Sequence, residues 1–234
     1  NARPMRPALT VVVCTWNRAA MLGGALDALT RQLDTPPHEI LVVDNGSRDE
    51  TAMQVHRLAA RHRQITYMFE ARPGLSCARN AALRRARAPI VAFTDDDVRV
   101  APDWMTRIVA GFERWPAASC IGGPVVPDWP APRPAWLTRR HWAPLGLQDY
   151  GTEPVRADST HPICLVGANV AFRRSALERV GEFSLDVQRV GAGGGSTEDH
   201  ELHLRLWASG RHGMYDPQLR VRAIVPPERL EKAH

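Results

Sequence analysis

Residues 89–97, Pro89-Ile90-Val91-Ala92-Phe93-Thr94-Asp95-Asp96-Asp97, join an apolar run directly to three consecutive carboxylates. The apolar run predicts a buried strand, and the acids stand where that strand ends. Because adjacent carboxylates repel one another, they need a compensating positive charge, and a divalent metal is the obvious candidate. The stretch therefore predicts a strand whose carboxyl end binds a metal and a phosphate-bearing ligand.

Strand-like and helix-like segments alternate around this stretch. Apolar runs predict further strands over 9–14, 40–43 and 65–69. Helical spacing predicts helices over 22–33, 75–87 and 174–180, a helix that opens with a capping box of Ser47 and Glu50, and a helix that starts at 197–199 and ends at Gly210. Such alternation predicts an α/β fold with a largely parallel sheet. Ligands of such sheets bind at the carboxyl ends of the strands, where Thr15, Asp44 and Asp95 fall.

The composition bounds the size of the fold and its environment. With 234 residues, of which 44% are hydrophobic and 24% charged, the chain suits one large α/β domain. No apolar run reaches the ~18 residues that span a bilayer, and the first residues lack the apolar segment of a secretory signal, which predicts a soluble, cytoplasmic protein. The four cysteines have no metal-type spacing and are expected to be reduced core residues: Cys14, Cys77, Cys120 and Cys164.

The net charge of +5 comes almost entirely from arginine, with Lys232 as the only lysine. The arginine fork suits diphosphates, but a genome rich in G and C gives the same bias without a functional reason. No basic run is interleaved with aromatic residues, so nucleic acid is not expected as a partner. Peripheral contact between a basic face and an anionic membrane, such as the inner face of the cell membrane, stays open, and the sequence does not indicate an oligomeric state.

The second half of the chain has a different character. Residues 124–162 are rich in proline and tryptophan and show little periodicity, which predicts a long ordered loop or short helices rather than a hidden domain. The glycine run 191–195 predicts a flexible segment that fits a mobile lid, although a plain loop would have the same composition. It stands just before the acidic pair Glu198 and Asp199.

Six short motifs follow one another along the chain: Val-Val-Cys-Thr-Trp-Asn-Arg at 12–18, Val-Val-Asp-Asn-Gly-Ser at 42–47, the segment 74–80 with Ala-Arg-Asn at its end, Asp-Asp-Asp at 95–97, Gly-Ala-Asn at 167–169 and Glu-Asp at 198–199. In this order, from about Leu9 to Leu230, they resemble the inverting nucleotide-sugar glycosyltransferases of family 2. The resemblance implies the GT-A fold, a Rossmann-like three-layer sandwich with a mostly parallel central sheet and a smaller acceptor-side subregion. It also implies one domain over 1–234, with a nucleotide-sugar-binding half over about 9–123 and an acceptor-side half over about 124–234.

The turn after the first strand is expected to bind the donor. It contains Thr15, Trp16, Asn17 and Arg18, of which Trp16 can stack on a nucleobase and Arg18 lies near phosphate. The resemblance implies that Asp44 accepts a hydrogen bond from the base or the ribose. An ordinary helix N-cap and a turn aspartate would use the same residue types, so these alternatives stand beside the donor site.

The segment that begins at Gly74 resembles the part of these enzymes that approaches the donor's diphosphate. Glycine lets the backbone come close, a helix N-terminus favours an anion, and Arg79 adds charge-assisted hydrogen bonds. Arg72 is expected to assist. The alternative for Arg79 is a surface arginine on a helix.

The resemblance assigns the acidic cluster to the ribose and the metal. Asp95 is a ribose or metal contact, Asp96 belongs to the donor site, and Asp97 is the direct ligand of Mg²⁺ or Mn²⁺, which bridges both phosphates. The donor is a nucleoside diphosphate sugar, with uridine diphosphate sugars first by analogy. The acceptor is a hydroxyl of a glycan, a lipid or a small molecule.

Inverting transfer requires a base that takes the acceptor hydroxyl's proton as the hydroxyl attacks the anomeric carbon. In the similar enzymes the second acid of the Glu-Asp pair is this base. Asp199 is therefore the expected base, and Glu198 positions it or contacts the acceptor. The alternative is a pair of acids that the dipole of a helix favours in its first turn.

Two residues of this chain depart from the family pattern. Ala223 stands where many relatives have a histidine that joins the metal or phosphate site, and Asn45 stands where they often have a second aspartate.

Two rival enzyme classes predict a different sequence after the first strand. A sugar nucleotidyltransferase predicts a glycine-rich, lysine-bearing loop there, and a dinucleotide oxidoreductase predicts Gly-x-Gly-x-x-Gly; both are missing. A non-catalytic sugar-nucleotide-binding protein is the remaining alternative.

Overall fold

The computed structural model describes residues 6–190 and 197–230. Its α-helices are α1 (Ala19–Thr30), α2 (Thr51–Ala59), α3 (Leu75–Arg85), α4 (Trp104–Arg114), α5 (Arg174–Val180) and α6 (Glu198–Ala208). Its strands are β1 (Leu9–Thr15), β2 (His38–Asp44), β3 (Ile65–Phe69), β4 (Ile90–Asp95), β5 (Val98–Val100), β6 (Cys120–Gly122), β7 (Val125–Asp128), β8 (Val155–Ala157), β9 (Asn169–Arg173), β10 (Gly213–Tyr215) and β11 (Val221–Ile224). Short 3₁₀ helices cover Arg139–His141, Ala143–Leu145 and Pro227–Leu230.

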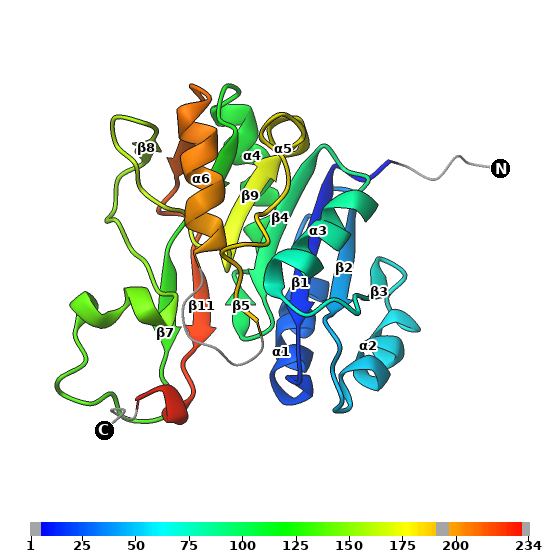
Figure 1. Cartoon of the computed structure of the whole chain (residues 1–234). Helices are drawn as coiled ribbons and strands as arrows, with labels where there is room; N and C mark the ends of the chain where they lie inside the picture. The colour runs from blue at the N-terminus through cyan, green and yellow to red at the C-terminus, as the bar shows by residue number, and fades with distance from the viewer. Residues whose placement is uncertain (1–5, 191–196, 231–234) are drawn as a thin grey trace.

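An eight-stranded sheet passes through the molecule in the order β3-β2-β1-β4-β9-β6-β10-β8 (Figure 1). β3, β2, β1 and β4 are parallel neighbours, and so are β6 and β10, whereas β9 is antiparallel to β4 and β6, and β8 to β10. The predicted α/β fold with a mostly parallel central sheet is confirmed. Thr15 pairs with Asp44, and Cys14 pairs with Asp95, so the carboxyl ends of β1, β2 and β4 form one edge.

Helices cover both faces of this sheet. Because side chains alternate along a strand, Val11 and Val13 of β1 belong to one buried cluster and Val12 to another. The first cluster includes residues of α1, α2 and α4, and the second includes residues of α3, α5 and α6. The chain therefore forms the expected three-layer sandwich, in which α3 and α6 cover the same face of the sheet.

A smaller, three-stranded sheet stands beside the acidic cluster, in the order β5-β11-β7 (Figure 1). β11 is antiparallel to β5 and parallel to β7. The backbone N–H of Ile224 in β11 donates a hydrogen bond to the carbonyl of Asp97 at 2.9 Å. This hydrogen bond holds β11, and with it the small sheet, beside the acidic cluster.

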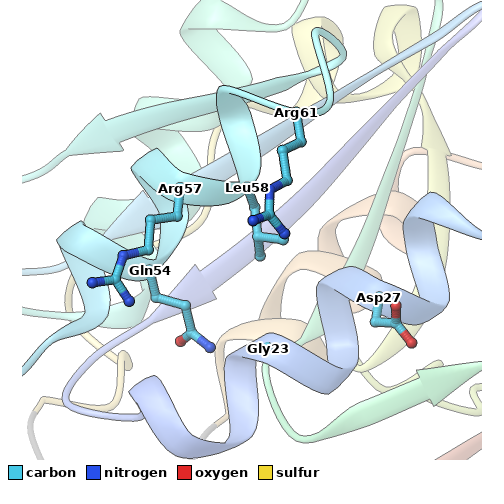
Figure 2. Close-up of a pocket in the computed structure, with 6 residues that line it drawn as sticks. All are labelled: Gly23, Asp27, Gln54, Arg57, Leu58 and Arg61. Atoms are coloured by element: carbon cyan, nitrogen blue, oxygen red, sulfur yellow. The ribbon is translucent and has the colours of Figure 1, made fainter.

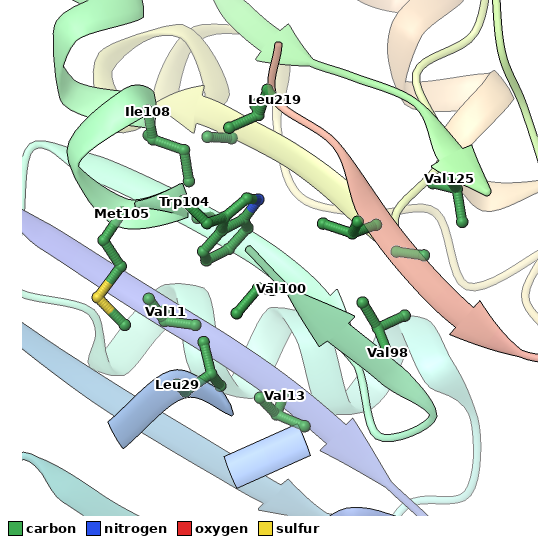
Figure 3. Close-up of a cluster of buried hydrophobic side chains, with 14 of the residues drawn as sticks. Val11, Val13, Leu29, Val98, Val100, Trp104, Met105, Ile108, Val125 and Leu219 are labelled. Carbon is green, nitrogen blue, oxygen red and sulfur yellow. The ribbon is translucent and has the colours of Figure 1, made fainter. Parts of the chain in front are cut away.

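Trp104 joins the two halves of the chain in one core. It is 1% exposed and belongs to the cluster that contains Val11 of β1 and Leu219 from the segment before β11 (Figure 3). Its indole N–H donates to Oδ1 of Asn169 at 2.8 Å, and the amide of Asn169 donates to the carbonyls of Pro124 and Leu219. Asn169, which ends the Gly-Ala-Asn motif, therefore connects buried backbone in this fold.

Two expectations about helix ends are wrong. α1 ends at Thr30, and Leu33, which was expected on its apolar face, is 61% exposed. α2 begins without the predicted capping box: the hydroxyl of Ser47 accepts from the backbone N–H of Asn17, and the carboxylate of Asp49 accepts from the N–H of Thr51. A hydroxyl and an acid at capping spacing do not make a cap when a neighbouring loop offers a donor first.

The proline-rich region 124–162 contains the predicted short helices, together with the strands β7 and β8. The glycine run 191–195 lies outside the described residues. All four cysteines are free; Cys77 and Cys120 are buried, and Cys14 and Cys164 are partly buried. Among the described residues, no helix combines the length and the apolar composition that crossing a bilayer requires.

Candidate active site

The carboxylates at the end of β4 are already in contact with a cation from the turn after β1. Arg18 Nη1 lies 2.6 Å from Asp97 Oδ2 and 3.3 Å from Asp96 Oδ1. The hydroxyl of Thr15 donates to Asp96 Oδ2 at 2.7 Å. Arg18 was expected near phosphate, and in this structure it supplies part of the positive charge that the acidic cluster needs.

Arg18 does not fully offset the effects of burial and of the neighbouring carboxylates on the pKa values of Asp95 and Asp96. Burial, and then the charge of Asp97, raise the pKa of Asp95 to about 6. The same two causes raise the pKa of Asp96 to about 7, although Arg18 and the Thr15 hydroxyl oppose them. Removal from water and a neighbouring negative charge both disfavour the ionised carboxylate, and a nearby cation favours it. Carboxylate oxygens suit a hard divalent cation, so the residues present fit Mg²⁺ or Mn²⁺.

The cluster does not form a complete metal site from protein atoms. Within residues 6–190 and 197–230, no group of three or more His, Cys, Asp or Glu side chains is placed to hold one metal ion. Mg²⁺ bound by one or two carboxylates usually completes its shell with water and phosphate oxygens. A metal held by Asp95 or Asp97 would take its remaining ligands from water or from phosphate oxygens.

The metal-free protein is expected to lose stability as the pH rises from about 4 to about 7. In this window the folded state holds the protons of Asp95 and Asp96, whose pKa values are raised, while the unfolded chain has released them. The loss is on the order of 3 kcal/mol for Asp95 and on the order of 4 kcal/mol for Asp96. Urea unfolding with a chelator at pH 4 and pH 8 measures the loss.

Asp96→Asn is the control for this pH dependence, because it removes one of the two titrating groups. Buried His203 has a lowered pKa and makes the opposite contribution, since its neutral form is favoured in the folded state as the pH rises. The comparison of parent and variant removes that contribution. Equal changes in unfolding free energy between the two pH values would contradict a raised pKa of Asp96.

The expected nucleobase site lies at the end of β2. Asp44 is 1% exposed; its Oδ1 accepts from the N–H of Ser47 and its Oδ2 from the hydroxyl of Tyr67. Asn17 has a φ of +52° and accepts from the N–H of Arg48, which joins the loops after β1 and β2. Trp16 is 40% exposed and thus accessible to a planar ligand. The donor contacts of Asp44 and Trp16 stay predictions.

Asn45 organises the loop that leads to α3, a role that sequence reasoning did not assign. Its amide donates to the carbonyls of Glu70 and Arg72, and its Oδ1 accepts from the N–H of Gly74 at 2.8 Å. Gly74 has a φ of +128°, and a Cβ there would collide with Gln188. Arg72 is exposed and pairs with Glu70, so its expected donor contact also stays a prediction.

Arg79 has different partners from the diphosphate that the sequence suggested. Its side chain is 3% exposed, and its Nη1 lies 2.6 Å from Asp199 Oδ1 and 3.3 Å from Glu198 Oε1. The alternative of a surface arginine is wrong. Tertiary structure brings together three residues that the sequence analysis had placed separately, at the diphosphate and at the base.

The Gly-Ala-Asn motif completes this group of charges. The backbone N–H of Gly167 donates to Asp199 Oδ2 at 2.8 Å. A Cβ at residue 167 would collide with the side chains of Arg79 and Asp199, so only glycine fits between them. Glu198 is fully buried, whereas the Asp199 side chain is 15% exposed, so Asp199 is the acid that can meet a ligand.

Two further arginines, which sequence reasoning missed, carry charge toward the acidic cluster. Arg189, before the glycine run, lies close enough to Asp95 for their charges to interact, and Arg229 interacts in the same way with Asp97. Arg229 belongs to the Pro-Pro-Glu-Arg-Leu segment at 226–230. The position of this segment just after Ala223 was the feature of the sequence that could have placed Arg229 near the site. Ala223 itself is buried in β11 opposite Val98 of β5.

Two hollows on the surface lie away from these residues. One, of about 350 Å³, lies between α1 and α2 and is lined by Gly23, Asp27, Gln54, Arg57, Leu58 and Arg61 (Figure 2). The other, of about 500 Å³, lies where β4 begins and is lined mainly by Arg6, Arg84, Arg85, Arg87 and Arg174. Neither is lined by a residue expected to bind donor or metal. The candidate site is therefore defined by its charged groups at the opposite edge of the sheet.

Comparison with known proteins yields one family and several relatives. The family model described as Glycosyl transferase family 2 matches residues 10–181. The Glucosyl-dolichyl phosphate glucuronosyltransferase of Haloferax volcanii is 25% identical over 218 residues, which are 91% of this chain and 68% of that protein. The Validoxylamine A glucosyltransferase of Streptomyces hygroscopicus subsp. limoneus is 38% identical over 107 residues, which are 44% of this chain and 23% of that protein.

A solved structure extends this likeness to three dimensions. The mannosyltransferase PcManGT from Pyrobaculum calidifontis, in complex with GDP-Man and Mn²⁺, aligns with a TM-score of 0.71 and 26% sequence identity. The alignment covers 97% of this chain and 59% of that chain. This chain thus spans less than two thirds of PcManGT.

Proposed function

Because the chain belongs to glycosyltransferase family 2, we propose that it is a metal-dependent, inverting glycosyltransferase. It moves a sugar from a nucleoside diphosphate sugar to a hydroxyl of a glycan, a lipid or a secondary metabolite. One observation carries this proposal. The carboxylate of Asp199, fixed by Arg79 and Gly167, lies close enough to Asp95 of the acidic cluster for their charges to interact, which supports a single site for the proposed base and the proposed metal ligands.

Asp199 takes the acceptor's proton. Each of its oxygens already accepts one hydrogen bond, and an ionised carboxylate has further lone pairs to receive a hydroxyl. The acceptor oxygen forms a bond to the anomeric carbon while the bond from that carbon to the phosphate oxygen breaks, and the acceptor's proton goes to Asp199. Attack from the face opposite the leaving group inverts the anomeric configuration.

The donor occupies the edge formed by β1, β2 and β4. Asp44 and the Trp16 ring receive the nucleobase and ribose, with uridine diphosphate sugars as the first donors to test. Gly74 lets the backbone approach the diphosphate, and Asp95 and Asp97 hold Mg²⁺ or Mn²⁺. When bound, the metal neutralises the charge that develops on the departing diphosphate. Arg18 must release Asp97 for this contact, and its guanidinium is then free to meet a phosphate oxygen.

A screen of donors tests the proposal. UDP, GDP and their sugars are added with and without Mn²⁺, and the melting temperature is measured. A donor at ~100 times its Kd raises the melting temperature by several degrees, and the rise should depend on Mn²⁺. Incubation with the best donor and small hydroxyl acceptors should then release free nucleoside diphosphate, and NMR of the product should give the inverted anomer.

The same screen distinguishes the alternatives. Stabilisation by a sugar nucleotide without any release of nucleoside diphosphate would identify a non-catalytic sugar-nucleotide-binding protein. Formation of a sugar nucleotide from a sugar phosphate and a nucleoside triphosphate would identify a nucleotidyltransferase. No stabilisation by any nucleotide, with or without metal, would overturn the proposal.

A further inference from the structure

Arg79 is a buried cation that contacts both acids at the start of α6. Its Nη1 lies 2.6 Å from Asp199 Oδ1 and 3.3 Å from Glu198 Oε1. The side chains of Arg79 and Glu198 are 3% and 0% exposed. Ion pairs so far from water interact more strongly than surface pairs, and removing one partner costs several kcal/mol. These contacts therefore constrain where the guanidinium can be.

Two aromatic rings restrict Arg79 further. Its guanidinium carbon lies 5.7 Å from the ring centre of Phe93 on β4 and 5.1 Å from that of Phe183, which follows α5. Guanidinium groups at such distances from a ring are attracted to its face. A movement of Arg79 toward a donor diphosphate would break these contacts and withdraw a counter-charge from buried Glu198. The guanidinium is thus a fixed part of the α3–α6 contact.

Asp199 is consequently held on both of its oxygens. Arg79 donates to Oδ1, and the N–H of Gly167 donates to Oδ2 at 2.8 Å. Because the two donors come from different elements, they fix the position and the plane of the carboxylate together. A base that is fixed in this way meets the acceptor hydroxyl in one orientation.

Glu198 is the second carboxylate that Arg79 contacts. The same Arg79 Nη1 atom lies 2.6 Å from Asp199 Oδ1 and 3.3 Å from Glu198 Oε1. Glu198 is fully buried and cannot meet a substrate, and its contact with Arg79 helps to fix the guanidinium. Asp199, the exposed member of the pair, therefore remains available to receive the proton.

We propose that Arg79 and Glu198 are positioning residues for the base Asp199, and that Arg79 does not contact the donor diphosphate. This proposal rests on the glycosyl transfer proposed above. It replaces the donor contact that the sequence suggested for Arg79, and it gives Glu198 a role that excludes contact with the acceptor. Both residues act through Asp199, so their effects should depend on the presence of that carboxylate.

Arg79→Lys is the first test, because it keeps the charge but loses the planar fork. It should lower kcat for transfer by ~10- to 100-fold through misplacement of the base, while donor Kd in Mn²⁺ stays within about twofold. Glu198→Gln should show the same split between kcat and donor affinity. Arg84→Gln is the matched control: it lies on the same helix, pairs with Glu182 at the surface, and should leave both constants unchanged.

A double variant separates positioning from a phosphate contact. In the Asp199→Asn background, Arg79→Lys should cause no further loss of residual transfer, because the carboxylate that Arg79 holds is gone. A residue that contacts the diphosphate would add its full loss in that background. A tenfold weaker donor Kd in Arg79→Lys, a parental kcat, or losses that multiply in the double variant would each overturn the proposal.

The ion pair can also be measured without any substrate. Urea unfolding of Arg79→Lys, Asp199→Asn and the double variant should give a coupling of at least about fivefold in the unfolding equilibrium constant. If the parent transfers no sugar but this coupling is found, the proposed function fails and the structural basis of the inference stands. If transfer is found and the coupling is absent, the inference fails alone.

Discussion

Replacing Asp199 with Asn is expected to lower kcat for sugar transfer by about 10³-fold and to leave donor affinity within about twofold. The amide has nearly the same size but cannot take a proton. One oxygen of Asp199 now accepts from Arg79 at 2.6 Å and the other from the N–H of Gly167 at 2.8 Å. Asn has a single oxygen, so one of these contacts is lost as well. Steady-state transfer kinetics and donor titration in Mn²⁺ measure the two effects separately.

The matched control is Asp27→Asn. Asp27 lies on α1, is exposed, and pairs with Arg31 at the surface, so its loss should change neither kcat nor donor Kd. If Asp199→Asn retained more than a third of the parental kcat, Asp199 would not be the base. If it lost donor affinity and kcat in equal measure, the carboxylate would be part of the donor site.

Trp104→Ala is expected to lower the free energy of unfolding by about 4 kcal/mol. The indole is 1% exposed in the cluster of Figure 3, and its N–H donates to Oδ1 of Asn169 at 2.8 Å. The variant leaves both a cavity and a buried acceptor without this donor. In a chain of this size, a loss of this magnitude lowers the melting temperature by roughly 10 °C. Urea unfolding and calorimetry give the two quantities.

Two other tryptophan variants isolate the cause. Trp16→Ala removes an indole that is 40% exposed and should change the unfolding free energy by less than about 0.5 kcal/mol. Trp104→Phe keeps most of the side-chain volume but not the hydrogen bond. Its loss of unfolding free energy should therefore lie between those of Trp16→Ala and Trp104→Ala. Equal midpoints for Trp104→Ala and Trp16→Ala would show that Trp104 does not join the halves of the core.

The central strands were predictable because they are buried on both faces. The continuous apolar run at 9–14 gave β1 to within a residue, and the run at 40–43 lies inside β2, since a strand of a covered parallel sheet has few polar positions. The run at 65–69 gave the bounds of β3, which is an edge strand with mostly half-buried residues. The carboxyl edge followed from the same runs, because the residue after each run stands where its strand ends. The order of strands and helices in the first half could therefore be predicted from the sequence.

The smaller sheet could not be predicted in this way. β5, β7 and β11 have only three or four residues each, and a segment of this length has no measurable periodicity. Its existence depends on pairing Val100 with Val221, which are remote in sequence. The start of α2 was predicted wrongly for a related reason. Ser47 has the right spacing for a cap, but its hydroxyl accepts a hydrogen bond from the backbone N–H of Asn17, which is remote in sequence.

Composition and pattern alone established an α/β sandwich with an acidic edge and an acidic pair at the start of a late helix. Which carboxylates pair with the arginines depends on the tertiary structure alone. Arg18 pairs with an aspartate 79 positions away and Arg79 with one 120 positions away. A buried guanidinium pairs with a carboxylate that the fold places beside it, because an unpaired buried charge is strongly destabilising. Residues far apart in the sequence form such a pair, so no local spacing predicts it.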